Sequence, residues 1–549
     1  MNRIWQKKYD PGVRTTLNYP QVPVHYFLTE SAKRYPDRIC IINDDLNLSY
    51  QEVDQLSTQV ASGLMQLGLA KGDRVAIMMP NCPQFVILYF GTLKAGGVVA
   101  AVNPQYRVEE LSYQIRDCGA RIVAAFPEQV DVINKINPPL QLDHVILSDP
   151  DDIKRTPQGK TIPVNVMPSK KITLNELLHL GQNRGQMRDI QHNDPAIFQY
   201  TGGTTGVPKG AIGLHRNLVA NILQFKEWLV GMKEGSEVVL AAIPLYHVYG
   251  MVIAMGVGLA LGASIVTLPN PKDLAGLLGS IEKHRVTLFP GVPNLYAAIN
   301  AQPDVIAGKY DLSTIKACIS GSAPLLFDIK RKFEAFTGGK LVEGYGLSEA
   351  PTATHCNPLH GENREGSIGL PLPDVDAKIV DSEAGTHEVQ IGEVGELIIR
   401  SPQVMEGYYG MEEETRQTLR DGWLYTGDLA RMDEDGYFYL VDRKKDVIKI
   451  GGFQVWPREV EQVIASHPAV KDVAVAGVPH PQYGEAVKAW IVLEPGMSIS
   501  LDEMQSWCEE RLARYKKPTL IEAIDQVPRT GVGKVLRREL VRRHIEALK

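Results

Sequence analysis

The run YTGGTTGVPK, at Tyr200–Lys209, decides how the rest of this chain is interpreted. It contains three glycines, three threonines and a lysine directly after the apolar stretch Ala196–Gln199. Glycine lets backbone N–H groups turn toward an anion without a Cβ in the way, while hydroxyls and a lysine add donors and positive charge. The run therefore predicts a phosphate-holding loop, with a flexible surface turn as the alternative. It is not a Walker loop, because Lys209 is followed by Gly210.

Length and charge indicate a globular protein with more than one domain. The 549 residues exceed the about 250–300 that one hydrophobic core organises. A net charge of −6 argues against nucleic acid as a partner. Residues 511–549 are locally basic, with eleven Lys/Arg against four Asp/Glu. That segment predicts a solvated amphipathic helix or a local contact with an anionic ligand.

The cysteines and the N-terminus indicate a cytoplasmic location. No Cys-x-x-Cys pair occurs among the six cysteines, which argues against disulfides and structural zinc. Residues 1–10 lack an apolar region, so no signal peptide is expected. The uncharged run Gly250–Leu268 is nominally long enough to span a bilayer, but its glycines and β-like end favour a buried helix followed by a buried strand.

Strand-like and helix-like patterns alternate through the first half of the chain. Apolar runs that read as strands are 74–79, 98–102, 238–243, 264–268, 287–289 and 315–320. Helical stretches such as 82–95 lie between them, so the alternation predicts parallel sheets covered by helices. After about Gly366, the runs 377–380 and 395–400 predict a smaller, mostly antiparallel module.

A domain boundary is expected at the charged run Asp442–Asp446. A complete α+β pattern restarts after it: helices at 458–467 and 502–514, strands at 470–478 and 486–493, and a final basic helix. We therefore expect an N-terminal domain at 1–444 and a C-terminal domain at 445–549. An exposed charged turn within one domain is the alternative.

Four further motifs follow the loop: YGLSE (345–349), YTGD (425–428), DRKKDVIK (442–449) and PRTGVGK (528–534). Over nearly the whole chain, this ordered set resembles the adenylate-forming superfamily of acyl-CoA synthetases, firefly luciferases and peptide-synthetase adenylation domains. The resemblance implies an α/β fold with two helix-covered, mainly parallel sheets, a small β-barrel-like module and a small mobile α+β domain. It also implies ATP, Mg²⁺ and coenzyme A. A carboxylate attacks the α-phosphate of ATP, and a thiol then expels AMP from the acyl-adenylate.

The resemblance places the triphosphate at the loop and the metal at Glu349. The implied phosphate-binding positions are Thr201, Gly202, Gly203, Thr204, Thr205, Gly206 and Lys209. Mg²⁺ prefers hard oxygen ligands, and the resemblance implies Glu349 and Thr204 as those ligands. Gly202 stands where the family usually has Ser, so that side-chain contact is not carried over. A solvated surface acid is the alternative for Glu349.

The nucleoside contacts implied by the family fall on three of the motifs and on the segment 320–324. Asp428 would accept hydrogen bonds from the ribose hydroxyls, as acids do in dinucleotide sites. Arg443 would contact the nucleotide. The adenine-side positions are Gly321, Ser322, Ala323, Pro324, Tyr345, Gly346 and Ser348. A core aromatic is the alternative for Tyr345, and Ser348 replaces the commoner Thr while keeping its hydroxyl.

Lys534 resembles the adenylation lysine, which bridges the carboxylate and the α-phosphate. The alternative is one more basic residue in a basic tail. In the family, the small domain rotates at the position of Lys445, and Gly451 and Gly452 then line the pantetheine channel. His247 matches a family position at the acyl site and is the third catalytic candidate beside Lys534 and Glu349. A satisfied core histidine is the alternative for His247.

The substrate expectation is a medium- or long-chain fatty acid. Segments resembling bacterial fatty acyl-CoA synthetases are 5–13, 79–84, 102–106 and 441–446, and the candidate pocket walls are His247, Met251, Val292, Pro293 and Gly321. Three alternatives stay open: an aryl or short or branched acid, loading of a carrier protein, and nucleotide binding without catalysis. Peripheral membrane association and a homodimer are also left open.

Overall fold

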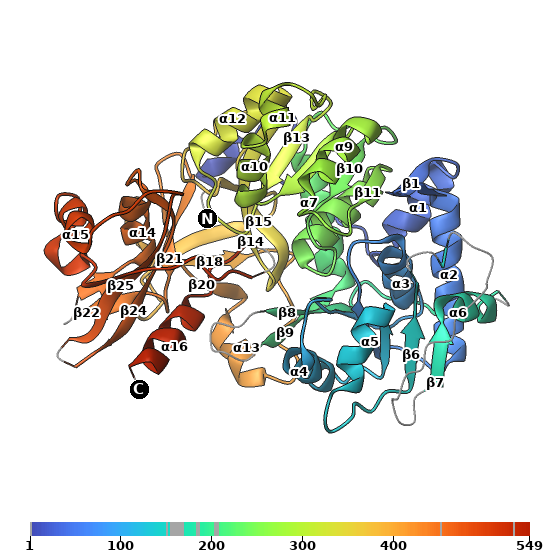
Figure 1. Ribbon diagram of the computed structural model, residues 1–549. Coiled ribbons are helices and arrows are strands. Elements are labelled where there is room, and N and C mark those ends of the chain that lie inside the picture. The colour runs from blue at the N-terminus through green and yellow to red at the C-terminus, as the bar shows by residue number, and fades with distance from the viewer. Residues whose placement is uncertain are drawn as a thin grey trace. The chain divides into compact units, whose positions relative to one another are not determined.

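The computed structural model describes residues 3–149, 152–153, 170–182, 187–201, 208–450, 453–481, 483–530 and 533–548 (Figure 1). The chain divides into two compact units. Unit 1 comprises Met1–Glu365, Gly369–Asp376 and Arg400–Leu424; unit 2 comprises Gly366–Ile368, Ala377–Ile399 and Tyr425–Lys549. The domain boundary expected after residue 444 stays a prediction.

A seven-stranded sheet forms the first half of unit 1, in the order β7-β6-β5-β3-β4-β8-β9. Its strands are β3 (Arg74–Met78), β4 (Val98–Ala101), β5 (Ile122–Ala125), β6 (His144–Leu147), β7 (Lys170–Thr173), β8 (Pro195–Thr201) and β9 (Lys209–Leu214). All neighbours are parallel except β8 and β9, which are antiparallel. The strands expected at 74–79 and 98–102 are confirmed.

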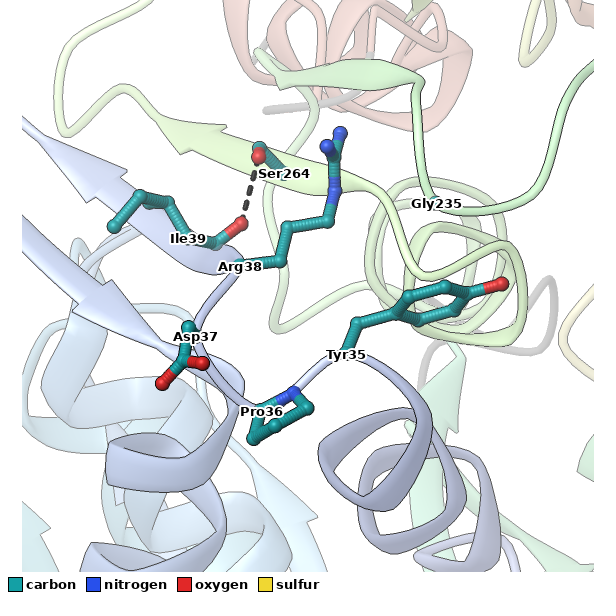
Figure 2. Close-up of a pocket in the computed structure, with 7 residues that line it drawn as sticks. All are labelled: Tyr35, Pro36, Asp37, Arg38, Ile39, Gly235 and Ser264. Atoms are coloured by element: carbon teal, nitrogen blue, oxygen red, sulfur yellow. Dashed lines mark hydrogen bonds between the residues drawn. The ribbon is translucent and has the colours of Figure 1, made fainter.

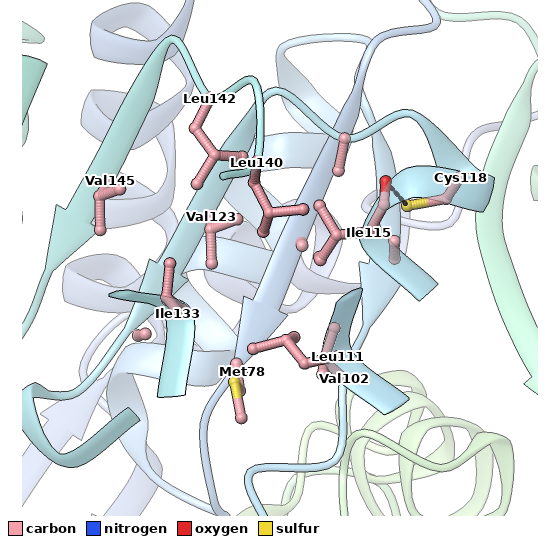
Figure 3. Close-up of a cluster of buried hydrophobic side chains, with 14 of the residues drawn as sticks. Met78, Val102, Leu111, Ile115, Cys118, Val123, Ile133, Leu140, Leu142 and Val145 are labelled. Carbon is pink, nitrogen blue, oxygen red and sulfur yellow. Dashed lines mark hydrogen bonds between the residues drawn. The ribbon is translucent and has the colours of Figure 1, made fainter. Parts of the chain in front are cut away.

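Helices bury this sheet on both faces, as parallel sheets require. The helices between residues 26 and 180 are α1 (Tyr26–Arg34), α2 (Tyr50–Gln66), α3 (Pro83–Lys94), α4 (Val108–Cys118), α5 (Pro127–Asn134) and α6 (Leu174–Leu180). Side chains of α4 and α5 pack on Met78, Val123 and Val145 in one buried cluster (Figure 3). Helix α3 is buried all round, and a Cβ on its Gly91 would lie 2.3 Å from Val60 of α2. Glycine is therefore what allows α2 and α3 to approach so closely.

A nine-stranded sheet forms the second half of unit 1, in the order β16-β15-β14-β13-β12-β10-β11-β1-β2. Its strands are β1 (Ile39–Asn43), β2 (Leu46–Ser49), β10 (Val238–Ala241), β11 (Ser264–Thr267), β12 (Leu288–Gly291), β13 (Ala317–Ser320), β14 (Lys340–Leu347), β15 (Ala350–Cys356) and β16 (Leu370–Pro371). The central strands are parallel, and β2, β15 and β16 add antiparallel edges. Helices of this half are α7 (His215–Trp228), α9 (Leu274–His284), α10 (Pro293–Asn300), α11 (Pro303–Ile306) and α12 (Phe327–Thr337).

The apolar run Gly250–Leu268 is a buried helix followed by a buried strand, as expected. A π-helix, η2 (Gly250–Gly256), continues as α8 (Val257–Ala260), and β11 follows. Among the residues that the structure describes, no helix is both long and apolar enough to cross a membrane. All six cysteines are free and buried, which confirms that they form no disulfide framework.

Unit 2 holds most of a five-stranded sheet and a separate α+β sheet. The first contains β17 (Asp376–Val380), β18 (Gly395–Arg400), β20 (Trp423–Met432) and β21 (Phe438–Arg443), with β19 (Leu419–Arg420) at its end. The second is β23-β22-β25-β24 with β26 beside β25: β22 (Ile448–Ile450), β23 (Phe453–Val455), β24 (Val470–His480), β25 (Gly484–Leu493) and β26 (Leu520–Ala523). Its helices are α14 (Pro457–Ala465), α15 (Leu501–Glu509) and α16 (Arg537–Ala547).

One sequence-based helix boundary is wrong. The helix expected at 502–514 ends at Glu509, and a short 3₁₀ turn, η3, follows at Arg514–Lys516. The chain leaves the helix and then buries Leu512 in the core that contains Val460 and Met504. Tertiary packing therefore overrides the local helical pattern.

Candidate active site

The predicted phosphate loop connects the two antiparallel strands β8 and β9. Thr201, the last residue of β8, pairs with Lys209, the first residue of β9, so both ends of the loop are fixed at neighbouring points. The Tyr113 hydroxyl donates to the Pro208 carbonyl at 2.8 Å and anchors the loop exit to α4. The predicted positions Gly202, Gly203, Thr204, Thr205 and Gly206 lie outside the described residues.

Glu349 lies in the tight turn between β14 and β15, where Tyr408 holds it. The Tyr408 hydroxyl donates to Glu349 Oε1 at 2.8 Å, and the Met405 N–H donates to the Glu349 carbonyl at 2.8 Å. The Lys209 ammonium lies 5.2 Å from the centroid of the Tyr408 ring, within cation–π range. The structure thus brings Glu349 and the end of the loop together through a residue that the sequence analysis missed.

The donors at Glu349 fit a magnesium ion that shares phosphate oxygens. Mg²⁺ is usually held by one or two carboxylates together with substrate phosphates rather than by a complete protein cage. Glu349 supplies one partly exposed carboxylate, which Tyr408 links to Lys209 at the start of β9. Within the described part of the chain, no cluster of three or more His, Cys, Asp or Glu side chains could hold a metal by itself.

The segment predicted to line the adenine follows β13 directly. Ser320 ends β13 and pairs with Glu343 of β14, whose carboxylate accepts a hydrogen bond from the Leu325 N–H at 3.1 Å. Between them, Ser322 has a φ of +71°. Non-glycine residues rarely adopt such a conformation, and it concentrates at functional sites. Gly321, Ala323 and Pro324 lie in the same segment, and a Cβ on Gly321 would lie 3.8 Å from the Gly344 carbonyl oxygen of β14.

Tyr345 and Gly346 lie in β14, just before the Glu349 turn that also holds Ser348. Tyr345 is buried, and its ring meets the His355 ring edge to face at a centroid distance of 5.9 Å. A Cβ on Gly346 would lie only 1.7 Å from the Thr352 carbonyl oxygen. Glycine is therefore required at residue 346 by the close β14–β15 approach, whatever its part in nucleotide binding.

The candidate acyl-site residues converge on Tyr249. The Tyr249 hydroxyl donates to the carbonyls of Ile319 at 2.6 Å and Gly291 at 3.1 Å, and its N–H donates to His247 Nδ1 at 3.2 Å. A Cβ on Gly321 would lie 3.3 Å from its ring. Burial raises the pKa of the Tyr249 phenol well above its usual value, so it stays a donor.

The remaining candidate pocket walls lie beside the groups that Tyr249 contacts. Val292 follows Gly291 directly, Pro293 begins α10, and the Met251 N–H donates to the His247 carbonyl at 2.9 Å. Tyr249 was absent from the sequence-based list because nothing in its local pattern distinguishes it from a core aromatic.

In unit 2, Asp428 and Arg443 are directly opposite each other on β20 and β21. Arg443 Nε lies 2.7 Å from Asp428 Oδ1, and the Asp428 side chain is only 4% exposed. The neighbouring Lys444 ammonium pairs with Glu396 at 2.7 Å. The structure therefore brings the predicted ribose acid and its arginine together.

The predicted hinge follows in a tight turn. The Asp446 N–H donates to the Arg443 carbonyl at 3.0 Å, which places Lys445 inside the turn. Burial lowers the pKa of Lys445 to about 8. Burial also raises the pKa of Asp442 to about 6, although the N–H groups of Arg443 and Arg458 donate to its carboxylate. The predicted channel residues Gly451 and Gly452 lie outside the described residues.

Lys534 is an exposed residue at the end of a narrow hairpin. The Thr530 N–H donates to the Lys534 carbonyl at 2.8 Å, and the Lys534 N–H donates to Thr530 Oγ1 at 3.1 Å. Arg529 anchors the hairpin to β24 through both carboxylate oxygens of Asp472, at 2.7 and 2.9 Å. Backbone hydrogen bonds and the Arg529–Asp472 pair therefore anchor the hairpin.

A surface pocket of about 580 Å³ lies elsewhere in unit 1 (Figure 2). Its lining residues are Tyr35, Pro36, Asp37, Arg38, Ile39, Gly235 and Ser264. None of them belongs to a sequence motif. The Arg38 guanidinium donates to the carbonyls of Gly262 and Glu237, and the Ser264 hydroxyl donates to the Ile39 carbonyl. Because these donors are engaged with backbone, we place the chemistry at the motif residues and not at this pocket.

The fold and these groups define an α/β protein of the adenylate-forming class. The chain belongs to the AMP-binding enzyme family: the family model matches residues 28–409, and the model of the AMP-binding enzyme C-terminal domain matches residues 459–534. The two matches together span both the loop and Lys534.

Characterised proteins resemble the chain over nearly its full length. It is 40% identical to a long-chain-fatty-acid–CoA ligase of Bacillus subtilis, over 99% of this chain and 98% of that protein. ATP-bound MatB from Rhodopseudomonas palustris is 30% identical with a TM-score of 0.83, covering 96% of this chain and 100% of that one. The anthranilate CoA ligase AuaEII with anthranoyl-AMP is 26% identical with a TM-score of 0.85, covering 97% and 99%.

Proposed function

We propose that this chain is an AMP-forming acyl-CoA ligase whose substrate is a medium- or long-chain fatty acid. It joins the acid to the α-phosphate of ATP, releases pyrophosphate and passes the acyl group to coenzyme A. The observation that carries the proposal is the 40% identity to a fatty-acid–CoA ligase across both units, with Glu349, Asp428 and Lys534 all present. The structural likeness to an anthranilate CoA ligase keeps an aryl acid as the second candidate substrate.

Charge neutralisation is the main requirement of the first step, because two anions must meet. Lys534 supplies a compact cation to bridge the attacking carboxylate and the α-phosphate. Lys209 and the loop amides hold the pyrophosphate end. Glu349 would hold Mg²⁺, which supplies neutralisation of the phosphate oxygens. Asp428 accepts hydrogen bonds from the ribose hydroxyls, and Arg443 fixes the orientation of the Asp428 carboxylate. The 2.7 Å ion pair between the two residues supports this role of Arg443.

The acyl chain enters between the start of η2 and the C-terminal ends of β12 and β13. His247 faces the carboxylate end, and the buried Tyr249 ring closes the site against Gly321. This assignment rests on the hydrogen bonds of Tyr249 to Gly291 and Ile319.

Thioester formation needs a second arrangement, because a lysine between the reactants obstructs the incoming thiol. The C-terminal domain, from residue 445, turns at Lys445 and presents Gly451 and Gly452 to the pantetheine arm. The position of Lys445 inside a tight turn supports a conformational role. Shielding the acyl-adenylate from water preserves the anhydride between the two steps.

Free buried cysteines support the cytoplasm as the location of the protein.

The proposal is tested by AMP release from ATP over a panel of carboxylates, from acetate through palmitate to benzoate, with and without free CoA. CoA-dependent release with fatty acids supports it. Release that is indifferent to CoA would indicate carrier loading or hydrolysis, and a preference for benzoates would transfer the assignment to the aryl class.

A further inference from the structure

The segment Met405–Tyr409 extends the seven-stranded sheet beside β9. The Glu406 N–H donates to the Ile212 carbonyl, the Ile212 N–H to the Gly407 carbonyl and the Tyr409 N–H to the Gly210 carbonyl, at 3.0, 2.9 and 2.8 Å. Ala211 and Tyr408 form an antiparallel bridge. This segment is therefore fixed in register with the strand that leaves the phosphate loop.

The same segment is also tied to the turn that carries Glu349. The Met405 N–H binds the Glu349 backbone carbonyl, and the Tyr408 hydroxyl binds the Glu349 carboxylate, each at 2.8 Å. One short stretch of chain thus contacts both the proposed metal ligand, Glu349, and the strand β9 that leaves the loop. The contact between Tyr408 and Glu349 joins residues 59 positions apart in the sequence.

The backbone of Tyr408 is itself fixed by a contact with Thr415. Its N–H donates at 2.9 Å to Oγ1 of Thr415, which lies in the middle of α13 (Glu412–Thr418). A Cβ on the preceding Gly407 would lie 2.7 Å from Thr415 Cγ2, so only glycine permits this approach. The ring and hydroxyl of Tyr408 are therefore presented from a braced backbone.

We propose that Tyr408 is a positioning residue for the metal–triphosphate end of the site. Its hydroxyl fixes the orientation of the Glu349 carboxylate, and its ring holds the Lys209 ammonium beside it. The inference deepens the proposed function and rests on it. Neither the motifs nor the family resemblance assigns a role to residue 408.

The physical argument concerns the rotation of a single carboxylate. With Oε1 hydrogen-bonded to a phenol, the carboxylate loses torsional freedom and Oε2 is left in a fixed direction for a cation. Hydrogen-bond partners of metal-ligating carboxylates typically change metal affinity or activity by about 10–100-fold when they are removed. The aromatic face holds the Lys209 ammonium at a point where phosphate charge must be met.

The roles of the Tyr408 hydroxyl and the Tyr408 ring can be tested separately. Tyr408→Phe removes the hydroxyl bond and keeps the ring under Lys209. We expect ATP affinity measured with Mg²⁺, without fatty acid or CoA, to fall about tenfold. ATP affinity measured in EDTA should stay unchanged. Tyr408→Leu removes the ring as well and should lower affinity in both conditions.

The experiment is isothermal titration of ATP into each variant with Mg²⁺ or with EDTA, alongside electron paramagnetic resonance of Mn²⁺ bound with ATP. Tyr409→Phe is the matched control, because it deletes the neighbouring hydroxyl from a ring that faces Phe198 at 4.7 Å. A double-mutant cycle with Glu349→Gln should show that Tyr408→Phe has little further effect once the carboxylate is gone.

Equal losses in Mg²⁺ and in EDTA for Tyr408→Phe would mean that the hydroxyl only supports the fold, and they would overturn the proposal. So would unchanged affinities, or additive effects in the cycle. Because these readouts use neither fatty acid nor CoA, a loss confined to Mg²⁺ would support the role of Tyr408 even if the ligase assignment failed. An intact ligase without that loss would refute the role of Tyr408 alone.

Discussion

Replacing Lys534 with alanine should separate the two half-reactions. The lysine is exposed, and its hairpin is anchored by the Arg529–Asp472 ion pair and by backbone bonds to Thr530. Substitution of an exposed surface side chain usually changes stability by at most about 0.5 kcal/mol. Removing one preorganised donor from a developing negative charge costs about 2.7–4 kcal/mol, or about 10²–10³ in rate. Adenylation should therefore slow by that factor while the melting temperature stays the same.

The assay compares fatty-acid-dependent exchange of pyrophosphate into ATP with thioester formation from supplied acyl-adenylate and CoA. Only the first should collapse in Lys534→Ala. Lys471→Ala, which removes an exposed lysine of β24 in the same unit, is the control and should alter neither rate. Equal losses in both half-reactions, or normal exchange, would refute the role of Lys534.

Three further predictions concern side chains that the structure places together. Burial lowers the pKa of His215 to about 3, so the stability that its neutral form contributes is present above pH 6.5 and is lost as the pH falls. Between pH 7 and pH 5 the free energy of unfolding should fall by about 2 kcal/mol. Urea unfolding of His215→Asn should not show this fall. Arg443→Ala removes the ion pair of the buried Asp428 carboxylate and should raise the KM for ATP about tenfold in steady-state assays, a loss of about 1.4 kcal/mol. An unchanged KM would mean that the Asp428–Arg443 pair takes no part in nucleotide binding. Tyr249→Ala removes the ring beside Gly321 and should raise kcat/KM for longer acyl chains relative to shorter ones by about tenfold, and an unaltered profile would exclude Tyr249 from the acyl site.

The local pattern of apolar residues and glycines predicted the secondary structure correctly where burial of that segment alone determines it. The strand at Arg74–Met78, the helix at Pro83–Lys94 and the buried helix and strand of Gly250–Leu268 follow directly from apolar runs and their glycines. The overlong helix at 502–514 shows the limit, since burial of Leu512 ended it earlier than its pattern indicates.

The functional contacts that sequence reasoning missed are long-range. Tyr408 reaches Glu349 across 59 residues, and Tyr249 reaches Ile319 across 70. Nothing adjacent to either tyrosine marks it, because only the folded sheets bring the partners together. The roles of Glu349, Asp428 and Lys534 came instead from motif order and stay predictions. The position of the domain boundary after residue 444 also stays a prediction.

The most direct test of the account follows the oxygen atoms of the fatty acid. Palmitate labelled with ¹⁸O in both carboxylate oxygens is incubated with the protein, ATP, Mg²⁺ and CoA, and the products are analysed by mass spectrometry. Attack of the carboxylate on the α-phosphate predicts AMP that carries one ¹⁸O, palmitoyl-CoA that retains the other, and unlabelled pyrophosphate. Label in inorganic phosphate with ADP as the nucleotide product, or unlabelled AMP, would contradict an acyl-adenylate mechanism.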